Sequence, residues 1–117
     1  MDAINIKDII PDNKIDLIYL HFSDPWPKKR NHKRRLTYMP YLKMYEDILK
    51  DKGVLVFKTD NESFFDDSIL YFEQSNFINL QLDRNYYKEN EPMTAYQEKF
   101  VLEGKPIYYA KYIINKV

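Results

Sequence analysis

Short apolar runs of strand length alternate along the chain with segments in which apolar residues recur every three or four positions. The runs predict four strands, at residues 15–22, 54–58, 77–82 and 106–114. The helical spacing predicts two helices, at residues 37–50 and 62–74. A polar loop at residues 83–94 and a short turn or helix at residues 95–102 are expected before the last strand.

Strands that alternate with helices predict an α/β fold with a parallel sheet and right-handed crossovers. Residues 15–22 (IDLIYLHF) are almost entirely apolar, which is typical of a strand covered on both faces. The loop at residues 24–27 (DPWP) should be rigid, because two prolines exclude continuation of the strand. Gly53 follows the first helix, where we expect it to act as the C-terminal cap.

Two aspartates follow consecutive predicted parallel strands. Asp24 comes after the first strand and Asp60 after the second. Open parallel sheets bind their ligands at the carboxyl ends of the strands, so the two carboxylates are expected side by side over one crevice. Position alone leaves a second interpretation open for each of them, as a turn residue or a helix N-cap.

Length and composition limit the class of protein. A chain of 117 residues with 44% hydrophobic content is expected to be one domain, and no apolar stretch is long enough to span a membrane. We therefore expect a soluble, cytoplasmic protein. Because the chain has no cysteine and only two histidines, no metal site is expected. The two glycines, Gly53 and Gly104, are isolated, which excludes a glycine-rich phosphate loop.

A net charge of zero hides a strongly basic segment. Residues 28–35 (KKRNHKRR) hold six of the 18 lysines and arginines and no acidic residue. Three of the four arginines lie in this segment, and the arginine fork suits phosphate better than lysine does. The pattern favours a phosphate-binding loop over a solvated charge run. Trp26, next to this segment, could stack on a nucleic-acid base, but we favour a hydrophobic plug that fixes the loop to the sheet.

Three motifs resemble those of the bacterial tRNA (guanine-N7)-methyltransferase family, a class I S-adenosylmethionine-dependent fold. Residues 22–30 (FSDPWPKKR) with 33–36 (KRRL) resemble its signature loop, and residues 57–61 (FKTDN) resemble its second motif. Residues 93–107 resemble its third motif. The positions that match are Met93, Thr94, Tyr96, Glu98, Lys99, Phe100, Gly104, Pro106 and Ile107. The resemblance implies a Rossmann-like sheet of parallel strands that ends in an antiparallel strand pair.

The resemblance also implies roles for particular residues. Asp24 would lie at the S-adenosylmethionine pocket and close to the chemistry, and Asp2 would contact the adenine of this cofactor. Lys28 and Asp60 would contact the RNA substrate. The segment Thr94, Ala95, Tyr96 and Gln97 would also contact the substrate. The phosphates of the tRNA would be held by Arg30, His32, Lys33, Arg34 and Arg35.

The chain departs from the family pattern in two places. Ala95 and Gln97 stand where the family usually has glutamates, which removes two carboxylates from the third motif. Met1 falls in what resembles the middle of the family's chain, so residues 1–117 are expected to form one incomplete domain without the glycine-rich half. We expect such a chain to be inactive alone and to self-associate through an exposed sheet edge.

The chemistry of guanine N7 is simple, because its lone pair is free at neutral pH and methyl transfer needs no general base. Positioning, and a carboxylate near the developing positive charge, are then the main requirements. Two alternatives stay open. One is an RNA-binding module that has lost catalysis. The other is an adenine amino-methyltransferase, although loops of that kind usually have two prolines before the aromatic residue and this one has only Pro25.

Overall fold

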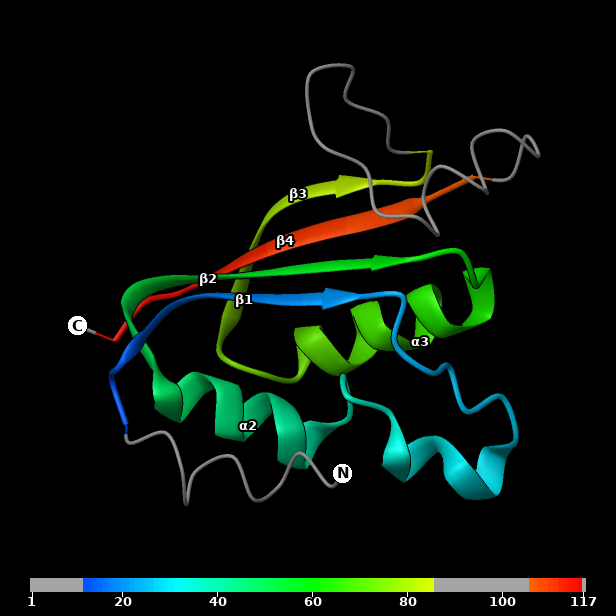
Figure 1. Cartoon of the computed structure of the whole chain (residues 1–117), viewed down its shortest axis with the longest axis horizontal. Helices are drawn as coiled ribbons and strands as arrows, with labels where there is room; N and C mark the ends of the chain where they lie inside the picture. The colour runs from blue at the N-terminus through cyan, green and yellow to red at the C-terminus, as the bar shows by residue number, and fades with distance from the viewer. Residues whose placement is uncertain (1–11, 86–105, 117) are drawn as a thin grey trace.

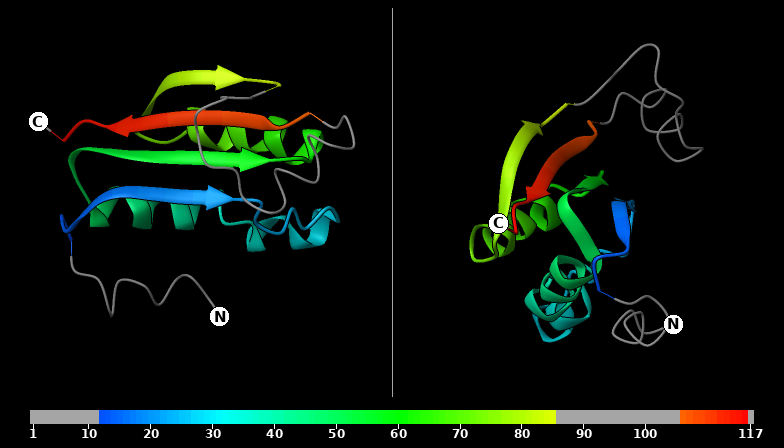
Figure 2. Two further views of the ribbon diagram at one scale, coloured as in Figure 1. Left: turned by 45° about the horizontal axis from the view of Figure 1, so that its top comes forward. Right: turned by 90° about the vertical axis from the view of Figure 1, so that its left-hand side faces the viewer.

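The computed structural model, which describes residues 12–85 and 106–116, contains one four-stranded sheet with its helices on one face (Figure 1). The elements are β1 (Ile15–His21), the 3-10 helix η2 (Lys29–Arg34), α2 (Met39–Ile48), β2 (Leu49–Thr59), α3 (Glu62–Glu73), β3 (Phe77–Asp83) and β4 (Tyr108–Ile114). The strand order is β1-β2-β4-β3 (Figure 2). β1 and β2 are parallel, and β4 is antiparallel to both β2 and β3. The predicted α/β fold with a final antiparallel strand pair is confirmed.

The helix-covered face of the sheet carries an aromatic core centred on Phe57 of β2. The ring centroid of Phe57 lies 5.2 Å from that of Phe64 and 6.0 Å from that of Phe65, both on α3. Phe72 stacks on Tyr112 of β4 at 4.0 Å. Burial raises the pKa of Tyr112 to about 12, so its hydroxyl stays neutral at physiological pH. Each buried ring of this kind contributes roughly 1.5–3 kcal/mol of transfer free energy, which fixes α3 against the sheet.

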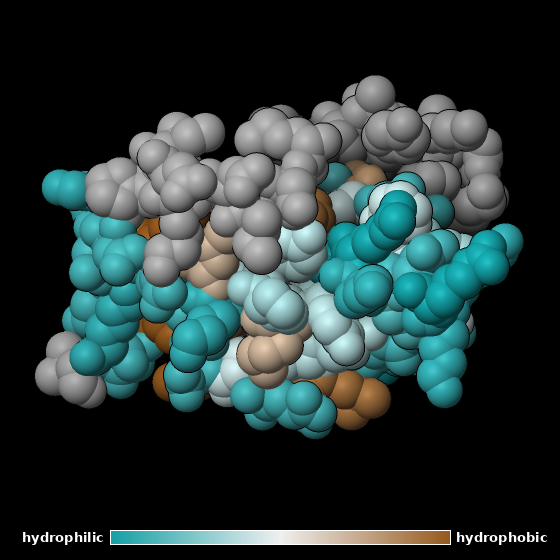
Figure 3. Space-filling view, turned by 90° about the horizontal axis from the view of Figure 1, so that it is seen from below, coloured by the Kyte–Doolittle hydropathy of each residue, from teal (hydrophilic) through white to brown (hydrophobic). Residues whose placement is uncertain are grey.

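The two α-helices are short, with 10 residues in α2 and 12 in α3. Within residues 12–85 and 106–116, no helix has both the length and the apolar character needed to cross a bilayer. A buried hydrogen bond of 2.7 Å between the hydroxyls of Thr37 and Ser68 joins the start of α2 to α3. Seen from the helix side, hydrophilic side chains gather at the end of the molecule where η2 lies (Figure 3).

Gly53 does not cap α2, so that prediction is wrong. The helix ends at Ile48, and the chain enters β2 directly at Leu49. The pairing of β1 with β2 then jumps from Leu49 to Val54, which makes an irregular bend in β2. A Cβ atom at residue 53 would lie 2.8 Å from the carbonyl oxygen of Lys50, so the bend requires glycine for close backbone approach rather than for capping.

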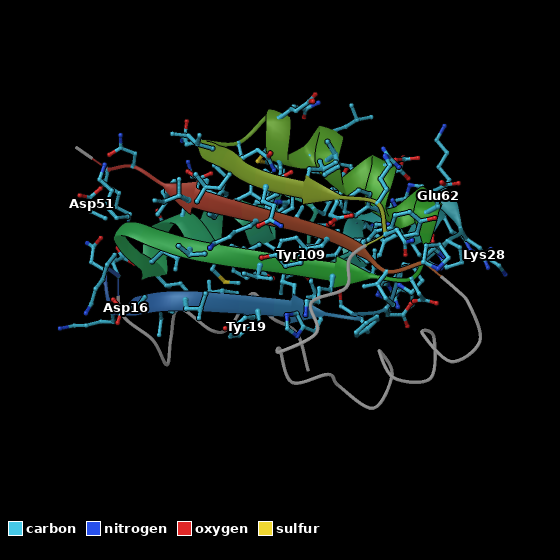
Figure 4. The ribbon with its side chains drawn as sticks, turned by 90° about the horizontal axis from the view of Figure 1, so that it is seen from above. Asp16, Tyr19, Lys28, Asp51, Glu62 and Tyr109 are labelled. Atoms are coloured by element: carbon cyan, nitrogen blue, oxygen red, sulfur yellow. The ribbon has the colours of Figure 1, made fainter. Side chains whose placement is uncertain are left out.

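β1 is covered on one face rather than on both, which corrects the interpretation of its continuous apolar run. Leu17 and Tyr19 are 41% and 59% exposed, whereas Leu20 on the other face is 7% exposed. Both α-helices lie on the same side of the sheet, as the two views in Figure 2 show. The side chain of Tyr19 therefore lies on the face away from the helices (Figure 4).

Candidate functional site

Asp24 and Asp60 lie at the same edge of the sheet, the one formed by the carboxyl ends of β1 and β2, as predicted from their places after parallel strands. β1 and β2 are neighbours, with His21 paired to Lys58 at the end of the ladder. The backbone N–H of Phe22 donates to the carbonyl oxygen of Lys58 at 2.8 Å, which keeps the two chains together beyond the last pair. Both aspartates are exposed, so both carboxylates are open to a ligand at this edge.

The loop after β1 is shaped by its own side chains. The carboxylate of Asp24 accepts a hydrogen bond of 2.9 Å from the backbone N–H of Trp26, so the turn interpretation of Asp24 holds as well. Phe22 and Trp26 have φ angles of 57° and 43°, a left-handed backbone that bulky residues rarely adopt. Strain of this kind is characteristic of functional loops that the surrounding structure holds in place.

The element that holds this loop is the buried side chain of Arg35. Its guanidinium donates to the carbonyl oxygen of Pro25 at 2.7 Å and to Asp67 at 2.8 Å. It also donates to the hydroxyl of Tyr71 at 3.0 Å. With only 2% of Arg35 exposed, one planar cation joins the loop to two residues of α3.

This position corrects the prediction that Arg35 holds tRNA phosphates. A phosphate cannot reach a side chain that is 2% exposed and already donates three hydrogen bonds inside the domain. Arg35 is therefore a structural residue. Its sequence neighbours gave no sign of this, because the basic run continues through it and the partners Asp67 and Tyr71 lie more than 30 positions away.

The other basic residues of the run lie in or beside η2. Arg30, Lys33 and Arg34 are exposed, and no acidic residue lies in the first turn of the helix. His32 is half-buried, with its Nε2 atom 3.2 Å from the carbonyl oxygen of Pro27. The guanidinium carbon of Arg34 lies 5.2 Å from the ring centroid of Trp26. The short helix thus folds back on the loop and brings the charge of Arg34 close to the segment that carries Asp24.

Lys28 and Asp60 are both exposed, and each lies just before a helix, Lys28 before η2 and Asp60 before α3. Lys28 immediately precedes η2, and Figure 4 shows it at the same end of the molecule as Glu62. Asp60 does not cap α3, because Asn61 does so by accepting a hydrogen bond of 2.8 Å from the N–H of Phe64. The side chain of Asp60 is therefore left for a role other than capping.

The edge also contains polar groups that sequence reasoning did not single out. Lys58, 2% exposed, lies in one cross-strand row with His21 and Tyr109, and its ammonium is 6.0 Å from the Tyr109 ring centroid. The buried hydroxyl of Ser23 has no hydrogen-bond partner among the described residues. Lys58 is the last residue of the apolar run predicted as a strand at residues 54–58, and its burial could not be deduced from that position.

Tyr108 adds a neutral donor close to the start of α3. Its hydroxyl donates to the carboxylate of Glu62 at 3.4 Å. Burial, and then the charge of Glu62, raise the pKa of Tyr108, so the phenol stays protonated. Within the described ranges no group of three or more acidic or histidine side chains is arranged to hold a metal ion.

The remaining predicted site residues lie outside the described residues. These are Asp2, which was expected to contact the adenine of the cofactor, and the segment Thr94, Ala95, Tyr96 and Gln97. Their roles stay predictions. The part of the site that can be described therefore consists of the two aspartates, the loop between β1 and η2, and the basic helix itself.

The fold is similar to that of solved methyltransferases. A solved SAM-dependent methyltransferase from Archaeoglobus fulgidus matches 97% of this chain and 65% of its own with a TM-score of 0.60 and 11% identity. A structure from Thermus thermophilus, described as a "Putative DNA Modification Methylase", matches 100% of this chain and 53% of its own with a TM-score of 0.66 and 13% identity. These similarities concern the fold alone.

The sequence comparison identifies the family. The family model described as "Putative methyltransferase" matches residues 1–110, and the chain belongs to this family. A tRNA (guanine-N(7)-)-methyltransferase of Oceanobacillus iheyensis is 44% identical over 119 residues, which cover 98% of this chain and 55% of the relative. One of Streptococcus mutans is 47% identical over 111 residues, covering 92% and 52%. The chain spans about half the length of these curated relatives and matches their C-terminal part.

S-adenosylmethionine is the methyl donor that the family and its fold imply. The described residues fit only one side of such a site. Asp24 offers an exposed carboxylate at a strand end, where it can accept hydrogen bonds from a ligand. The backbone cradle that usually holds such a ligand needs clustered glycines, and Gly53 is used in the bend of β2.

Replacing Arg35 should show that it is structural. We expect Arg35→Met to lower the free energy of unfolding of the full chain by about 2–3 kcal/mol, because Pro25, Asp67 and Tyr71 lose their common donor. Arg35→Lys should also destabilise, since an ammonium cannot reproduce the planar fork. Arg30→Met, a matched change at an exposed position, is the control. Urea denaturation that gave all three variants the wild-type midpoint would contradict this role.

Proposed function

We propose that this chain forms the tRNA-facing part of a tRNA (guanine-N7)-methyltransferase, which transfers a methyl group from S-adenosylmethionine to guanine 46 of tRNA. The relatives with this name are 44–47% identical to the chain. The observation that carries the proposal is the placement of Asp24 and Asp60 after neighbouring strands, with the exposed Arg34 of η2 over the ring of Trp26, whose N–H is bonded to Asp24. Carboxylates can accept hydrogen bonds from a guanine, and positive charge can hold the phosphates around it.

The reacting atom of the substrate sets the task of these residues. Guanine N7 has a free lone pair, so the protein has only to align it with the methyl group, which bound S-adenosylmethionine supplies as an electrophile on sulfur. The carboxylates of Asp24 and Asp60 can accept hydrogen bonds from N1 and N2 of guanine and so orient the base. The same negative charges stabilise the positive charge that develops on the ring. Neither residue has to move a proton.

Lys28 has a different task from the aspartates. A lysine that donated to N7 would occupy the lone pair that has to react, so its ammonium is assigned to O6 of guanine or to a phosphate. Its exposed position just before η2 supports this assignment. The neighbouring Arg30, His32, Lys33 and Arg34 extend the positive surface along the helix and contact phosphates. We further propose that the protein acts in the cytoplasm, where tRNA is available.

A second candidate function is RNA binding without catalysis. It is favoured by one observation, the isolation of both glycines in the sequence, because the described residues supply only one side of a cofactor site. We propose that the 117-residue chain alone transfers no methyl group for this reason. The two candidates separate when the N-terminal half of a relative is joined to this chain. A chimera that joins the N-terminal half of the Oceanobacillus iheyensis relative to this chain restores methyl transfer only if the edge described here is catalytic.

Asp24 can be tested in this chimera with an isosteric change. Asp24→Asn keeps an oxygen for the N–H of Trp26 and removes the charge, so we expect methyl transfer to fall by roughly 100-fold or more while tRNA affinity stays within about twofold of the parent. Asp16→Asn, near the start of the strand β1 that Asp24 follows, is the control, and Figure 4 shows Asp16 at the end of the molecule opposite Lys28. Equal losses of tRNA affinity and of methyl transfer would show that Asp24 only shapes the loop.

The basic helix can be tested through salt dependence. Phosphate contacts release counterions, so Arg30→Ala, Lys33→Ala and Arg34→Ala together should weaken tRNA binding and lower the slope of log K against log salt by about two to three. A control removes three exposed lysines away from η2, by Lys43→Ala, Lys50→Ala and Lys52→Ala. An equal change of slope in both triple variants would show that only the total charge matters.

We also propose that the chain forms a homo-oligomer through β1, a terminal strand of the sheet. β1 is a terminal strand of the described sheet, and it carries the exposed side chains of Leu17 and Tyr19. Sedimentation equilibrium should show a dimer or larger species that Leu17→Lys converts to monomer. Ile78→Lys on β3, the other terminal strand, should leave it assembled. A wild-type chain that sediments as a monomer at high concentration would refute the assembly.

A further inference from the structure

The environment of Trp26 does not match that of a hydrophobic plug. Trp26 is the only tryptophan of the chain and is half-buried. Among the described residues it belongs to neither of the two hydrophobic clusters, which include other partly buried aromatic residues such as Phe22 and Tyr71. The backbone nevertheless holds it in a left-handed conformation with φ of 43°. A large ring kept out of the core at an energetic cost indicates a purpose other than packing.

One side chain of the basic helix lies over this ring. The guanidinium carbon of Arg34 is 5.2 Å from the Trp26 ring centroid, and Arg34 itself is exposed. The contact is local, because η2 is fixed to the same loop by the approach of His32 to the carbonyl oxygen of Pro27 at 3.2 Å. Arg34 therefore lies over the ring while remaining exposed itself.

A nucleic-acid base should replace Arg34 on the Trp26 ring, because stacking of a base is stronger than the contact of an exposed cation with the ring. A cation over an aromatic ring at an exposed site is worth only about two- to fivefold in an equilibrium constant. Stacking of a nucleic-acid base on an aromatic side chain is worth roughly 5- to 150-fold in an equilibrium constant. Arg34 loses little when it leaves the ring, since its charge is then free to pair with a phosphate of the same RNA.

We infer that Trp26 is a stacking surface for a purine of the bound tRNA, and that Arg34 covers this surface in the free protein and moves to a phosphate when the RNA arrives. The inference rests on the proposed tRNA substrate. Asp24 is tied to Trp26 by the hydrogen bond of 2.9 Å, so the stacked base lies next to the carboxylate that recognises its edge. Arg34 thereby couples phosphate binding to exposure of the stacking surface.

The single tryptophan makes the test direct. Tryptophan fluorescence of the full 117-residue chain, excited at a wavelength that its 11 tyrosines do not absorb, reports on Trp26 alone. An unmodified tRNA transcript with a fluorescent end label reports binding independently by anisotropy. Saturating tRNA should quench Trp26 emission by at least about half, because a stacked guanine quenches an indole. In the free protein, Arg34→Ala should raise the acrylamide quenching constant of Trp26, whereas Arg30→Ala, which removes the same charge from the same helix, should not.

The outcomes separate the two proposals. Anisotropy that shows binding with no change of Trp26 emission would overturn the stacking role and leave the proposed function intact, whereas no binding at all would count against the proposed function. Trp26→Leu should weaken tRNA binding by about 10-fold with an unchanged salt slope. Equal acrylamide quenching in Arg34→Ala and wild type would overturn the covering role of Arg34. The emission measurement uses the unaltered chain, so it holds even if Trp26→Leu fails to fold.

Discussion

The geometry of the candidate site depends on the buried guanidinium of Arg35. Residues 24–27 contain two prolines, and Phe22 and Trp26 are strained, so a loop of this kind has no regular backbone hydrogen bonds to fix it. Arg35 supplies the fixed point, because it bonds the carbonyl oxygen of Pro25 on one side and two residues of α3 on the other. α3 is in turn anchored to the sheet by the aromatic core around Phe57. Burial of the core thus sets the position of the loop.

The basic residues near this fixed point differ in exposure, and their roles differ with it. Arg35 of the basic run is buried and structural, whereas Arg30, Lys33 and Arg34 of η2 are exposed. The carboxylates of Asp24 and Asp60 lie at the adjacent strand ends. An edge that carries both signs of charge can bind the phosphates of an RNA and the polar edge of a base at the same time, which a uniformly basic surface cannot do. This combination connects the fold to the proposed methyl transfer.

Much of the fold could be predicted from the sequence because local signals agreed with the tertiary structure. The helix predicted at residues 62–74 has an asparagine cap and a consistent apolar stripe, and it is found at Glu62–Glu73. The prediction for Gly53 was wrong because a glycine after a helix usually caps that helix. Only the pairing of β1 with β2 shows the bend that requires a glycine. The continuous apolar run of β1 likewise could not reveal that both α-helices lie on one side of the sheet.

The site was predictable in part for the same reason. Strand order alone places Asp24 and Asp60 at one edge, so their neighbourhood followed from the α/β pattern. The role of Arg35 depends on partners in a distant helix, and the contact of Arg34 with Trp26 depends on how a six-residue 3-10 helix folds back. Neither of these contacts is encoded in a local pattern. Basic residues that look equivalent in the sequence are therefore separated only by the packing.

Hydrogen exchange at the backbone amide of Trp26 tests the central claim most directly, since this amide is bonded to Asp24 only while the loop keeps its shape. Wild type should protect it, and Arg35→Lys should speed its exchange by about 10-fold or more while amides of β2 remain protected. Such a result would show that Arg35 holds the loop rather than the whole domain. An equally protected Trp26 amide in both proteins would contradict the account.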